Sequence, residues 1–363
     1  MSNPLDSTRL LPEFGREQIE LLESLCNALS VSGDEGEVRK IVLDQIKSVA
    51  HSVKVDLLGN VLAIREGTGE NRLRVMVSAH MDEVGFILSE DEENGLFRFE
   101  KVGGIDVRQL PGKAILVGKD HIPGVIGAKP IHLTTREERK YGIPLDALRI
   151  DLGPEGSSKA KIGDRGTFAS RFAQAGPSIF AKALDNRQGV ATLIELFKHA
   201  PDNIDLLAAF TVQEEIGARG ARVAAYALNP DLAIAVDSTP ANDLPAWDGA
   251  ENTAYNTHLG AGPAIYLADS STLSDPRLVR HVIASAEAEG IPYQFRQPGG
   301  GGTDAGVIHK QRAGIPSLSI SMPCRYTHTN SSVARLEDWK NTLALLHAAL
   351  KRLPASILVE PRQ

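Results

Sequence analysis

Cysteine is scarce in this sequence. Only Cys26 and Cys324 occur among 363 residues, far apart and in no metal-binding spacing. A fold stapled by disulfides and a zinc site built on a CxxC pair are therefore excluded. Two free thiols in a chain of this length are typical of a reducing compartment, so we expect a cytoplasmic protein.

Long apolar runs and an excess of positive charge are also missing. No window approaches the ~18–20 apolar residues of a membrane span. The first residues, MSNPLDSTRLLPEF, have neither the basic nor the apolar region of a signal peptide. Lysine and arginine number 39 against 46 acidic residues, a net charge of −7 without a basic stretch. These absences argue against nucleic acid or an anionic membrane surface as a partner.

What is present is the composition of a large globular protein. The chain is 42% hydrophobic and 23% charged, and its length allows two domains. Apolar periodicity predicts helices over 19–29 and 38–49, a hairpin over 53–64 and a buried strand over 73–79. After residue 183 the chain alternates between helices (187–199, 218–228, 276–289, 336–353) and strands (204–212, 232–236, 293–296, 317–321). This alternation predicts an α/β fold with a mixed sheet sandwiched by helices.

The stretch from 87 to 171 differs from the rest. It is rich in glycine, turns and short strand-like segments, and only the charged segment 134–142 looks like a helix. We expect a small β-rich domain, barrel-like or PDZ-like, inserted into a catalytic domain formed by residues 1–86 and 172–363. The apolar residues that look exposed in it are Ile115, Leu116, Val117, Val125 and Ile126. Because a small unit gains by burying such residues against a symmetry mate, the segment predicts a dimer.

Histidines and acidic residues accompany the apolar runs at five places. They are His80 with Asp82, Asp185, Glu214 with Glu215, Asp237, and His328. Each alone has a simpler explanation, such as a helix N-cap or a hydrogen-bonded structural histidine. That explanation would have to hold independently at every place. Because ligands bind beyond the carboxyl ends of strands in α/β sheets, we expect these side chains to form one site.

Imidazole and carboxylate are the ligands that catalytic zinc and cobalt take. The residues predict two divalent ions per subunit, zinc or cobalt with manganese as a further candidate, held by His80, Asp185, Glu215, Asp237 and His328. The remaining glutamate, Glu214, is then free to take a proton from the attacking water and give it to the leaving amine. Asp82 is two residues from His80, a spacing that suits fixing the imidazole tautomer. The sequence therefore predicts a two-metal hydrolase.

Six segments occur in an order that resembles the M42 family of metallo-aminopeptidases, which includes glutamyl and tetrahedral (TET) aminopeptidases. They are AHMDEVGF, ALDNRQG, QEEIGARGA, VDS, GGGTDAGVIH and RYTHT. The resemblance covers nearly the whole chain and implies an aminopeptidase with Glu214 as general base. The implied ligands are His80 and Asp237 for one ion, Glu215 and His328 for the other, and Asp185 as the bridge.

The same resemblance implies an assembly and a substrate class. The insertion would mediate dimerisation, and the dimers would build a hollow dodecamer that admits short peptides. The chain departs from the family pattern at His258, where a lysine is common. This difference bears on specificity or assembly and leaves the chemistry unchanged.

Some segments and activities have competing interpretations. The segment PGGGGTDAG, 298–306, lacks the GxxxxGK[ST] pattern of a phosphate loop. We expect instead that Gly301, Gly302 and Thr303 let backbone approach the substrate, with Thr303 and Asp304 opening a helix. A two-metal deacylase or other amidohydrolase and a catalytically silent assembly protein are alternative functions, although a spare Glu214 argues against the silent protein. An endoglucanase is disfavoured because carboxylates that bind metal leave no acid/base pair of the glycosidase type.

Overall fold

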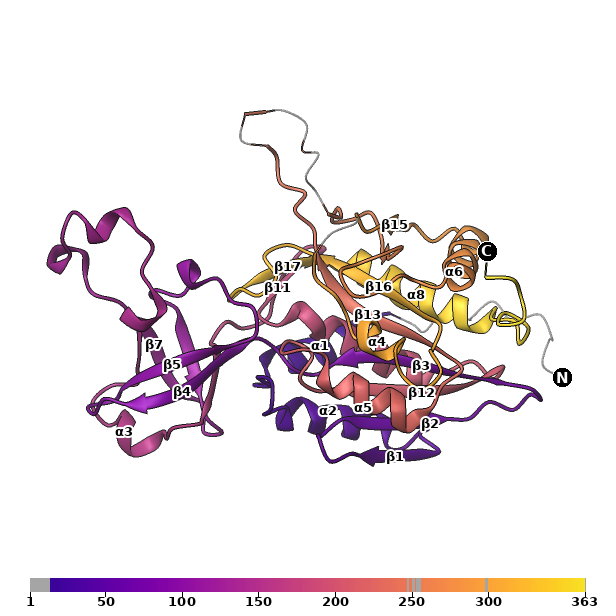
Figure 1. The fold of residues 1–363 in the computed structure, drawn as a ribbon, viewed down its shortest axis with the longest axis horizontal. Helices are drawn as coiled ribbons and strands as arrows, with labels where there is room; N and C mark the ends of the chain where they lie inside the picture. Colours follow the sequence, from indigo (N-terminus) through magenta and orange to yellow (C-terminus); the bar gives the residue numbers. More distant parts are fainter. Residues whose placement is uncertain (1–13, 247, 250–251, 253–255, 298–299, 363) are drawn as a thin grey trace.

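The structure is a computed structural model that describes residues 14–246, 248–249, 252, 256–297 and 300–362. It consists of an α/β domain, which contains the first and the last described residues, and a β-barrel beside it (Figure 1). Within the described ranges, no helix is long and apolar enough to cross a membrane. The two-part organisation agrees with the predicted insertion, while the predicted boundaries at 87 and 171 stay a prediction.

An eight-stranded mixed sheet forms the centre of the α/β domain, in the order β1-β2-β12-β3-β13-β16-β14-β15. Its four middle strands run parallel: β12 (Ile204–Thr211), β3 (Leu73–His80), β13 (Leu232–Pro240) and β16 (Ser317–Cys324). The predicted hairpin is confirmed as β1 (Ser52–Val55) paired antiparallel with β2 (Val61–Arg65). The short strands β14 (Ala264–Ile265) and β15 (Gln294–Phe295) form the other edge.

Helices cover both faces of this sheet, as predicted. One face packs on α1 (Arg16–Asn27), α2 (Gly36–Ile46), α4 (Leu184–Lys198), α6 (Pro276–Glu289) and α8 (Leu336–Lys351). The other packs on α5 (Arg219–Leu228) and α7 (Ala305–Ile308). Successive strand residues point to opposite faces, so Val75 and Val77 enter the larger core while Met76 enters the smaller one. The middle strands are therefore buried on both sides, which explains their nearly continuous apolar sequences.

Helix α6 shows how local sequence sets the ends of an element. Asp275 precedes the helix, and its carboxylate accepts a hydrogen bond from the backbone N–H of Arg277 at 3.0 Å. Pro276 occupies the first turn, where its missing N–H costs nothing. Gly290 ends the helix with a φ of 64°, a conformation that glycine adopts without strain. These signals explain why the sequence located this helix at 276–289 without error.

The inserted unit is a closed antiparallel barrel in the order β4-β5-β8-β7-β6-β9. Its strands are β4 (Gly85–Asp91), β5 (Leu96–Val102), β6 (Ala114–Val117), β7 (Ile122–Gly127), β8 (Arg149–Asp151) and β9 (Arg165–Phe168). A separate core fills it and includes Ile115, Val117 and Ile126. The prediction that these three residues are exposed was wrong, because alternate residues of a barrel strand point inward. Val125 is exposed, as predicted.

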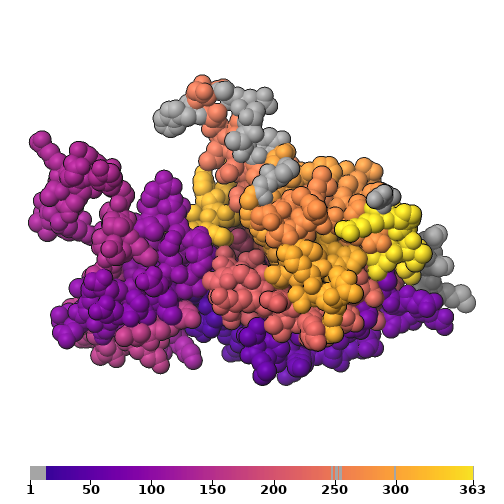
Figure 2. Space-filling view, in the orientation of Figure 1, coloured from indigo at the N-terminus to yellow at the C-terminus, as the bar shows by residue number. Residues whose placement is uncertain are grey.

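Besides Val125 and Ile162, the exposed large apolar side chains of the barrel domain lie on the connection between β7 and β8. Ile131, Leu133, Tyr141 and Ile143 are all exposed there. This segment, 128–147, projects from the barrel at the upper left of Figures 1 and 2. The charged stretch at 134–142 forms only a 3-10 turn, Glu138–Lys140, and no long helix.

Two further structures complete the helices and strands described here. They are the short α3 (Gly156–Lys159) and a small sheet of β10 (Ala173–Ala175), β11 (Ser178–Ala181) and β17 (Ser332–Arg335).

Candidate metal centre

The carboxyl ends of the parallel strands meet at one edge of the sheet and bring five predicted residues together, and the start of α4 adds a sixth. This acid–histidine cluster consists of His80, Asp185, Glu214, Glu215, Asp237 and His328. His80 is the last residue of β3, and Asp237 lies inside the neighbouring β13, which extends to Pro240. His80 Nε2 is 3.5 Å from an Asp237 carboxylate oxygen. The sequence had ended the β13 strand at residue 236, whereas the structure continues it through the site.

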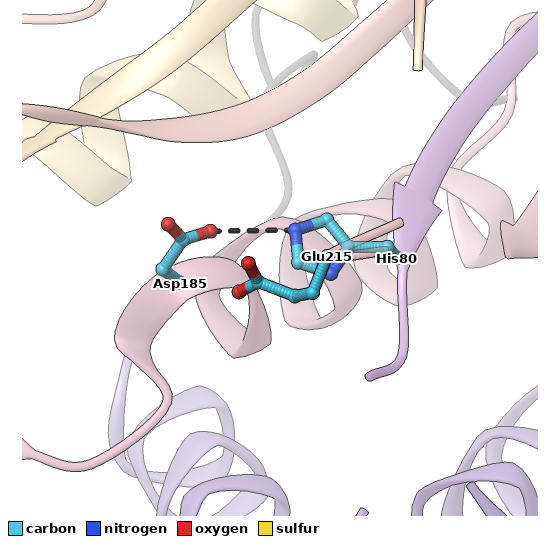
Figure 3. Close-up of side chains that lie close together, drawn as sticks. All are labelled: His80, Asp185 and Glu215. Atoms are coloured by element: carbon cyan, nitrogen blue, oxygen red, sulfur yellow. Dashed lines mark ion pairs between the residues drawn. The ribbon is translucent and has the colours of Figure 1, made fainter. Parts of the chain in front are cut away.

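Asp185 lies between the two imidazoles of the cluster. The chain leaves β11, passes through a left-handed Ala183, and enters α4 with Asp185 and Asn186 still in non-helical conformations. Asp185 Oδ1 is 3.3 Å from His80 Nε2, a contact drawn in Figure 3. Its other oxygen, Oδ2, is 3.4 Å from His328 Nε2. One carboxylate thus presents a different oxygen to each histidine.

His328 lies four residues beyond β16, in a left-handed backbone conformation. Its Nδ1 is 2.9 Å from the carbonyl oxygen of Gly104, which belongs to the barrel domain. A carbonyl can only accept, so Nδ1 carries the proton and donates. His328 Nε2 then faces Glu215 Oε2 at 3.2 Å. Gly104 had no signal in the sequence, because its contribution is a backbone atom.

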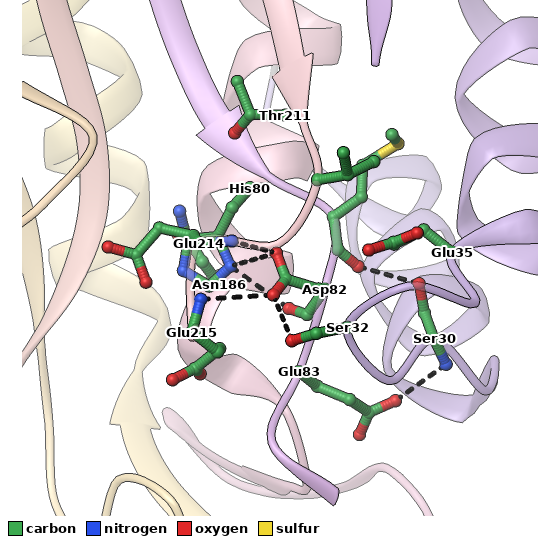
Figure 4. Close-up of polar contacts among 12 residues, drawn as sticks. Ser30, Ser32, Glu35, His80, Asp82, Glu83, Asn186, Thr211, Glu214 and Glu215 are labelled. Carbon is green, nitrogen blue, oxygen red and sulfur yellow. Dashed lines mark hydrogen bonds and ion pairs between the residues drawn. The ribbon is translucent and has the colours of Figure 1, made fainter. Parts of the chain in front are cut away.

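Asp82 connects His80 to the two glutamates (Figure 4). Its backbone carbonyl lies 3.1 Å from His80 Nδ1, which must therefore donate to it. Its carboxylate accepts hydrogen bonds from the backbone N–H groups of Glu214 at 3.0 Å and Glu215 at 3.2 Å. Ser32 Oγ donates to the same carboxylate at 2.6 Å. The sequence suggested that the Asp82 carboxylate orients His80, and its Oδ1 lies 3.4 Å from the same Nδ1. The contacts through backbone atoms leave no pattern in residue types.

The glutamate pair itself is presented by a sharp turn. Strand β12 ends at Thr211, and Gln213 follows with a φ of 57°, in the left-handed region. Gly217 has a φ of 116°, which is strained for any residue with a Cβ. These two positions let the chain reverse within a few residues. Both glutamates can therefore reach one site although they are adjacent in sequence.

The electrostatics of the cluster are dominated by buried carboxylates. Burial opposes a charge on His328, but its contacts with Asp185 and Glu215 outweigh burial and raise the imidazole pKa to about 11. Burial opposes a charge on His80 too, and Asp185 and Asp237 again raise its pKa. Burial raises the pKa of Asp237 to about 7 and also raises that of Glu214. The carboxylates therefore attract positive charge into the cluster strongly.

The residues of the cluster fit divalent metal ions. Because both Nδ1 atoms donate to carbonyls, each histidine directs Nε2 at carboxylate oxygens. The raised imidazole pKa values place a proton between these atoms when no metal is bound, and a divalent ion can replace that proton and bind the lone pair of Nε2. Asp185 Oδ1 and Glu215 Oε1 are buried and have no hydrogen-bond partner. One ligand atom each from His80, Asp185 and Glu215 lie within 4.8 Å of one another.

A cavity of about 620 Å³ adjoins the cluster, and Glu214 lies on its wall. The predicted substrate-binding residues Gly301, Gly302 and Thr303 also line it. Thr303 uses its hydroxyl internally, 2.7 Å from Ser319 Oγ and accepting from the Ala305 N–H at 3.2 Å. It thus opens helix α7, as predicted.

Asp304 does not cap α7 with its side chain. Its carboxylate instead accepts a hydrogen bond from the hydroxyl of Thr211 at 2.7 Å. Asp304 does stand at the N-cap position, so the predicted start of the helix is confirmed, but the sheet provides a competing donor for its carboxylate. Residues 298 and 299 of the glycine-rich segment lie outside the described residues.

A helix-covered α/β sheet that gathers imidazoles and carboxylates at its carboxyl edge, beside a cavity, suits a metal-dependent hydrolase. The chain belongs to the M42 peptidase family: the family model described as M42 glutamyl aminopeptidase matches residues 59–345. This range includes the barrel and all six residues of the cluster. It confirms that the resemblance noted in the sequence is a family relationship.

Relatives from other organisms match over nearly the whole chain. A lysyl aminopeptidase of Pyrococcus furiosus is 33% identical over 347 residues, covering 92% of this chain and 97% of the relative. The TET aminopeptidase of Thaumarchaeota archaeon SCGC AB-539-E09 superposes with a TM-score of 0.89 at 33% identity, covering 95% and 99% of the two chains. The Pyrococcus horikoshii TET1 peptidase, described as assembling into a tetrahedron or a large octahedral shell, gives 0.82 at 33% identity, covering 93% and 100%. The chain is accordingly an aminopeptidase-type hydrolase.

Proposed function

We propose that this protein is a metal-dependent aminopeptidase that removes N-terminal residues from short peptides. The observation that carries the proposal is the position of Asp185. Its two oxygens face His80 and His328 separately, and these histidines face Asp237 and Glu215 in turn. This is the donor set that a pair of divalent ions sharing one carboxylate requires.

In this proposal His80 and Asp237 hold one ion, Glu215 and His328 hold the other, and Asp185 bridges them. Zinc or cobalt suits these ligands, and manganese is a further candidate. When bound, the ions supply Lewis acidity for the peptide carbonyl and lower the pKa of water. Asp82 keeps the His80 ring oriented through the carbonyl contact at Nδ1.

Glu214 is proposed to move the proton. Its backbone N–H is fixed by Asp82, and its side chain lines the cavity. Burial raises its pKa above the usual range, which makes it a stronger base than an exposed glutamate. It accepts a proton from the attacking water and delivers it to the leaving amine nitrogen. Gly301, Gly302 and Thr303 are proposed to contact the peptide.

Self-association is proposed to take place first through the barrel domain. Segment 128–147 exposes Ile131, Leu133, Tyr141 and Ile143, and a two-fold contact would bury them. Dimers would then assemble into a dodecamer, the state in which the related PhTET1-12s was solved. Such a shell limits substrates to short or unfolded peptides. Both cysteines are free and buried, and we propose a cytoplasmic location.

A panel of aminoacyl-p-nitroanilides tests the function, with zinc, cobalt and manganese supplied separately. The proposal requires cleavage that depends on metal and on a free α-amine. The same panel with N-acetylated amino groups is the matched control and is expected to be inert. Release of acetate from the acetylated compounds, measured separately, would identify a deacylase instead, and release of p-nitroaniline from them would identify another amidohydrolase. Absence of any cleavage with full metal occupancy would identify a catalytically silent assembly protein.

A further inference from the structure

One face of the chain between Thr303 and Lys310 lines the catalytic cavity. Thr303, Gly306, Val307 and Lys310 all belong to the cavity wall, and their spacing places them on the same side of a helix. The segment consists of α7 with a turn on either side. At a helical rise of 1.5 Å per residue, the two ends of this face lie about 10 Å apart.

The first end of this face is tied to the strands that lead to the acid–histidine cluster. Asp304 accepts a hydrogen bond at 2.7 Å from the hydroxyl of Thr211, the last residue of β12, which is followed by the glutamate pair. Thr303 Oγ1 is 2.7 Å from Ser319 Oγ on β16, the strand that precedes His328. Lys310 therefore stands at the end of the face that is remote from these anchors.

The ammonium group of Lys310 is available to a ligand. Its side chain is exposed, and among the described residues it forms no hydrogen bond or ion pair. Arg296, the arginine of the same wall, uses its three nitrogens on Thr239 Oγ1 and on the carbonyl oxygens of Gln297 and Gly300. Lys310 is thus the lysine or arginine of the described wall that can bind an anion from outside the chain.

The surroundings of Lys310 are basic. Helix α5 and residues 305–312 pack against each other, and together they contain three arginines and Lys310 but no aspartate or glutamate. Gly217 and Ala218 line the cavity directly before α5. The carboxylates of the acid–histidine cluster lie in another part of the same wall. Negative and positive groups therefore occupy separate parts of one cavity.

This separation of charge matches a short peptide, which has an amino group at one end and a carboxylate at the other. An aminopeptidase holds the amino end at the cluster. An extended chain spans about 3.3–3.6 Å per residue, so the carboxylate of a dipeptide or tripeptide lies roughly 7–11 Å from its amino group. A lysine suits such a partner, because its flexible stem lets one ammonium follow carboxylates at slightly different distances.

We propose that Lys310 binds the C-terminal carboxylate of the substrate, and that the enzyme therefore favours dipeptides and tripeptides with a free carboxyl terminus over amidated ones. This inference rests on the proposed aminopeptidase function of the same site. It concerns the part of the peptide that is released, and it is independent of which N-terminal residue is removed.

The tripeptides X-Ala-Ala and X-Ala-Ala-amide provide the sharpest comparison, where X is the residue cleaved best in the p-nitroanilide panel. They differ only in the charge of the terminus. Wild-type protein is expected to cleave the free acid with a kcat/KM about 3- to 10-fold above that of the amide, between the effects of an exposed ion pair and of a hydrogen-bonded charge. The difference should lie in KM, because a carboxylate remote from the scissile bond is bound equally in the ground state and the transition state. It should shrink as salt is added.

Variants of Lys310 test the assignment. Lys310→Met should cleave the acid and the amide equally well, and Lys310→Glu should favour the amide. Aminoacyl-p-nitroanilides have no carboxylate, so their cleavage should be unchanged in Lys310→Met. Lys340→Met, which removes an exposed lysine on α8, is the matched control and should keep the wild-type preference. An unchanged preference in Lys310→Met, or an equal loss on all three substrates, would overturn the proposal.

An acidic side chain further along the peptide is the other source of the same chemistry. X-Ala-Glu-amide and X-Ala-Gln-amide distinguish it, because neither has a free carboxyl terminus. A Lys310-dependent preference for the glutamate compound, without a difference between X-Ala-Ala and its amide, would overturn the C-terminal assignment. Cleavage of p-nitroanilides together with equal cleavage of the acid and amide tripeptides would overturn this inference alone. No cleavage of any substrate would overturn the proposed function instead.

Discussion

Asp82 shows how much one residue organises this site. Its carbonyl orients His80, and its carboxylate holds the backbone of both glutamates. Burial opposes the charge of Asp82, but the contacts with His80, Ser32 and the Glu214 N–H outweigh it and lower the pKa. The residue stays ionised and fixes base and ligand together. Residue types and their order revealed the cluster, whereas the contacts through backbone atoms could not be predicted.

Glu214→Gln is expected to lower kcat by a factor of about 10² to 10⁴, the usual contribution of a general base. Glutamine has the same shape but cannot accept the proton. Metal content and melting temperature should be unchanged, because Glu214 is not needed as a ligand. Glu100→Gln, on the exposed face of the barrel, is the control and should turn over normally. Wild-type turnover of Glu214→Gln with full metal would refute the role.

Asp185→Asn is expected to lose at least one metal ion and activity together. The asparagine amide carries no charge and offers one oxygen in place of two, so it cannot bind both metal ions as the carboxylate is proposed to do. Elemental analysis of the purified variant provides the measurement, with the exposed Asp120→Asn as control. Two ions per chain in an inactive Asp185→Asn protein would show that Asp185 is not the bridge.

At the scale of elements, the sequence located most helices and strands because their periodicities are strong. It failed where tertiary context decides. Ile115, Val117 and Ile126 looked exposed because barrel closure is a long-range event, and the Asp304 carboxylate binds Thr211 in place of the helix N-terminus because a strand distant in sequence supplies the hydroxyl. Strand β13, which carries Asp237, also continues beyond the apolar residues from which it was predicted.

Several elements are held together by hydrogen bonds to one buried acidic residue, which was not predicted from the sequence. Glu83 accepts hydrogen bonds from Lys182 at 2.8 Å, Arg187 at 3.0 Å and Thr167 of the barrel at 2.9 Å. It also accepts from the backbone N–H of Ser30. Glu83 thus links the barrel, the N-terminal helices and α4 directly behind Asp82.

Glu83→Ala is expected to destabilise the protein by about 3–5 kcal/mol, because it leaves Lys182 and Arg187 buried without a counter-ion. Thermal or denaturant unfolding measures the change. Glu155→Ala removes an exposed pair with Lys159 and should change the free energy of unfolding by less than about 1 kcal/mol. Equal stability of the two variants would contradict the proposed importance of the buried network.

At the scale of the molecule, the barrel stands beside the α/β domain and yet contributes Gly104 to the site. A change in the position of the barrel would therefore alter the hydrogen bond that orients the His328 ring. Most of the exposed apolar residues of the barrel domain lie on segment 128–147, which projects from the barrel (Figures 1 and 2). Assembly through that segment would leave the cluster intact.

Ile131→Asp with Leu133→Asp is expected to release smaller species from the assembly, because charge on both residues opposes a buried contact. Light scattering measures the mass, and a single chain is 39.0 kDa. Cleavage of a small p-nitroanilide should persist. Leu57→Asp, an exposed apolar residue on the turn between β1 and β2, is the control. A wild-type monomer at micromolar concentration would refute self-association, and a wild-type dimer would refute only the dodecamer.

The most direct test of the two-metal account is a titration of chelator-treated protein with zinc, cobalt or manganese while cleavage of an aminoacyl-p-nitroanilide is followed. The acid–histidine cluster offers ligands for two ions around Asp185, so activity should be absent without metal and should reach its plateau near two equivalents per chain. Full activity after complete removal of metal would contradict the account.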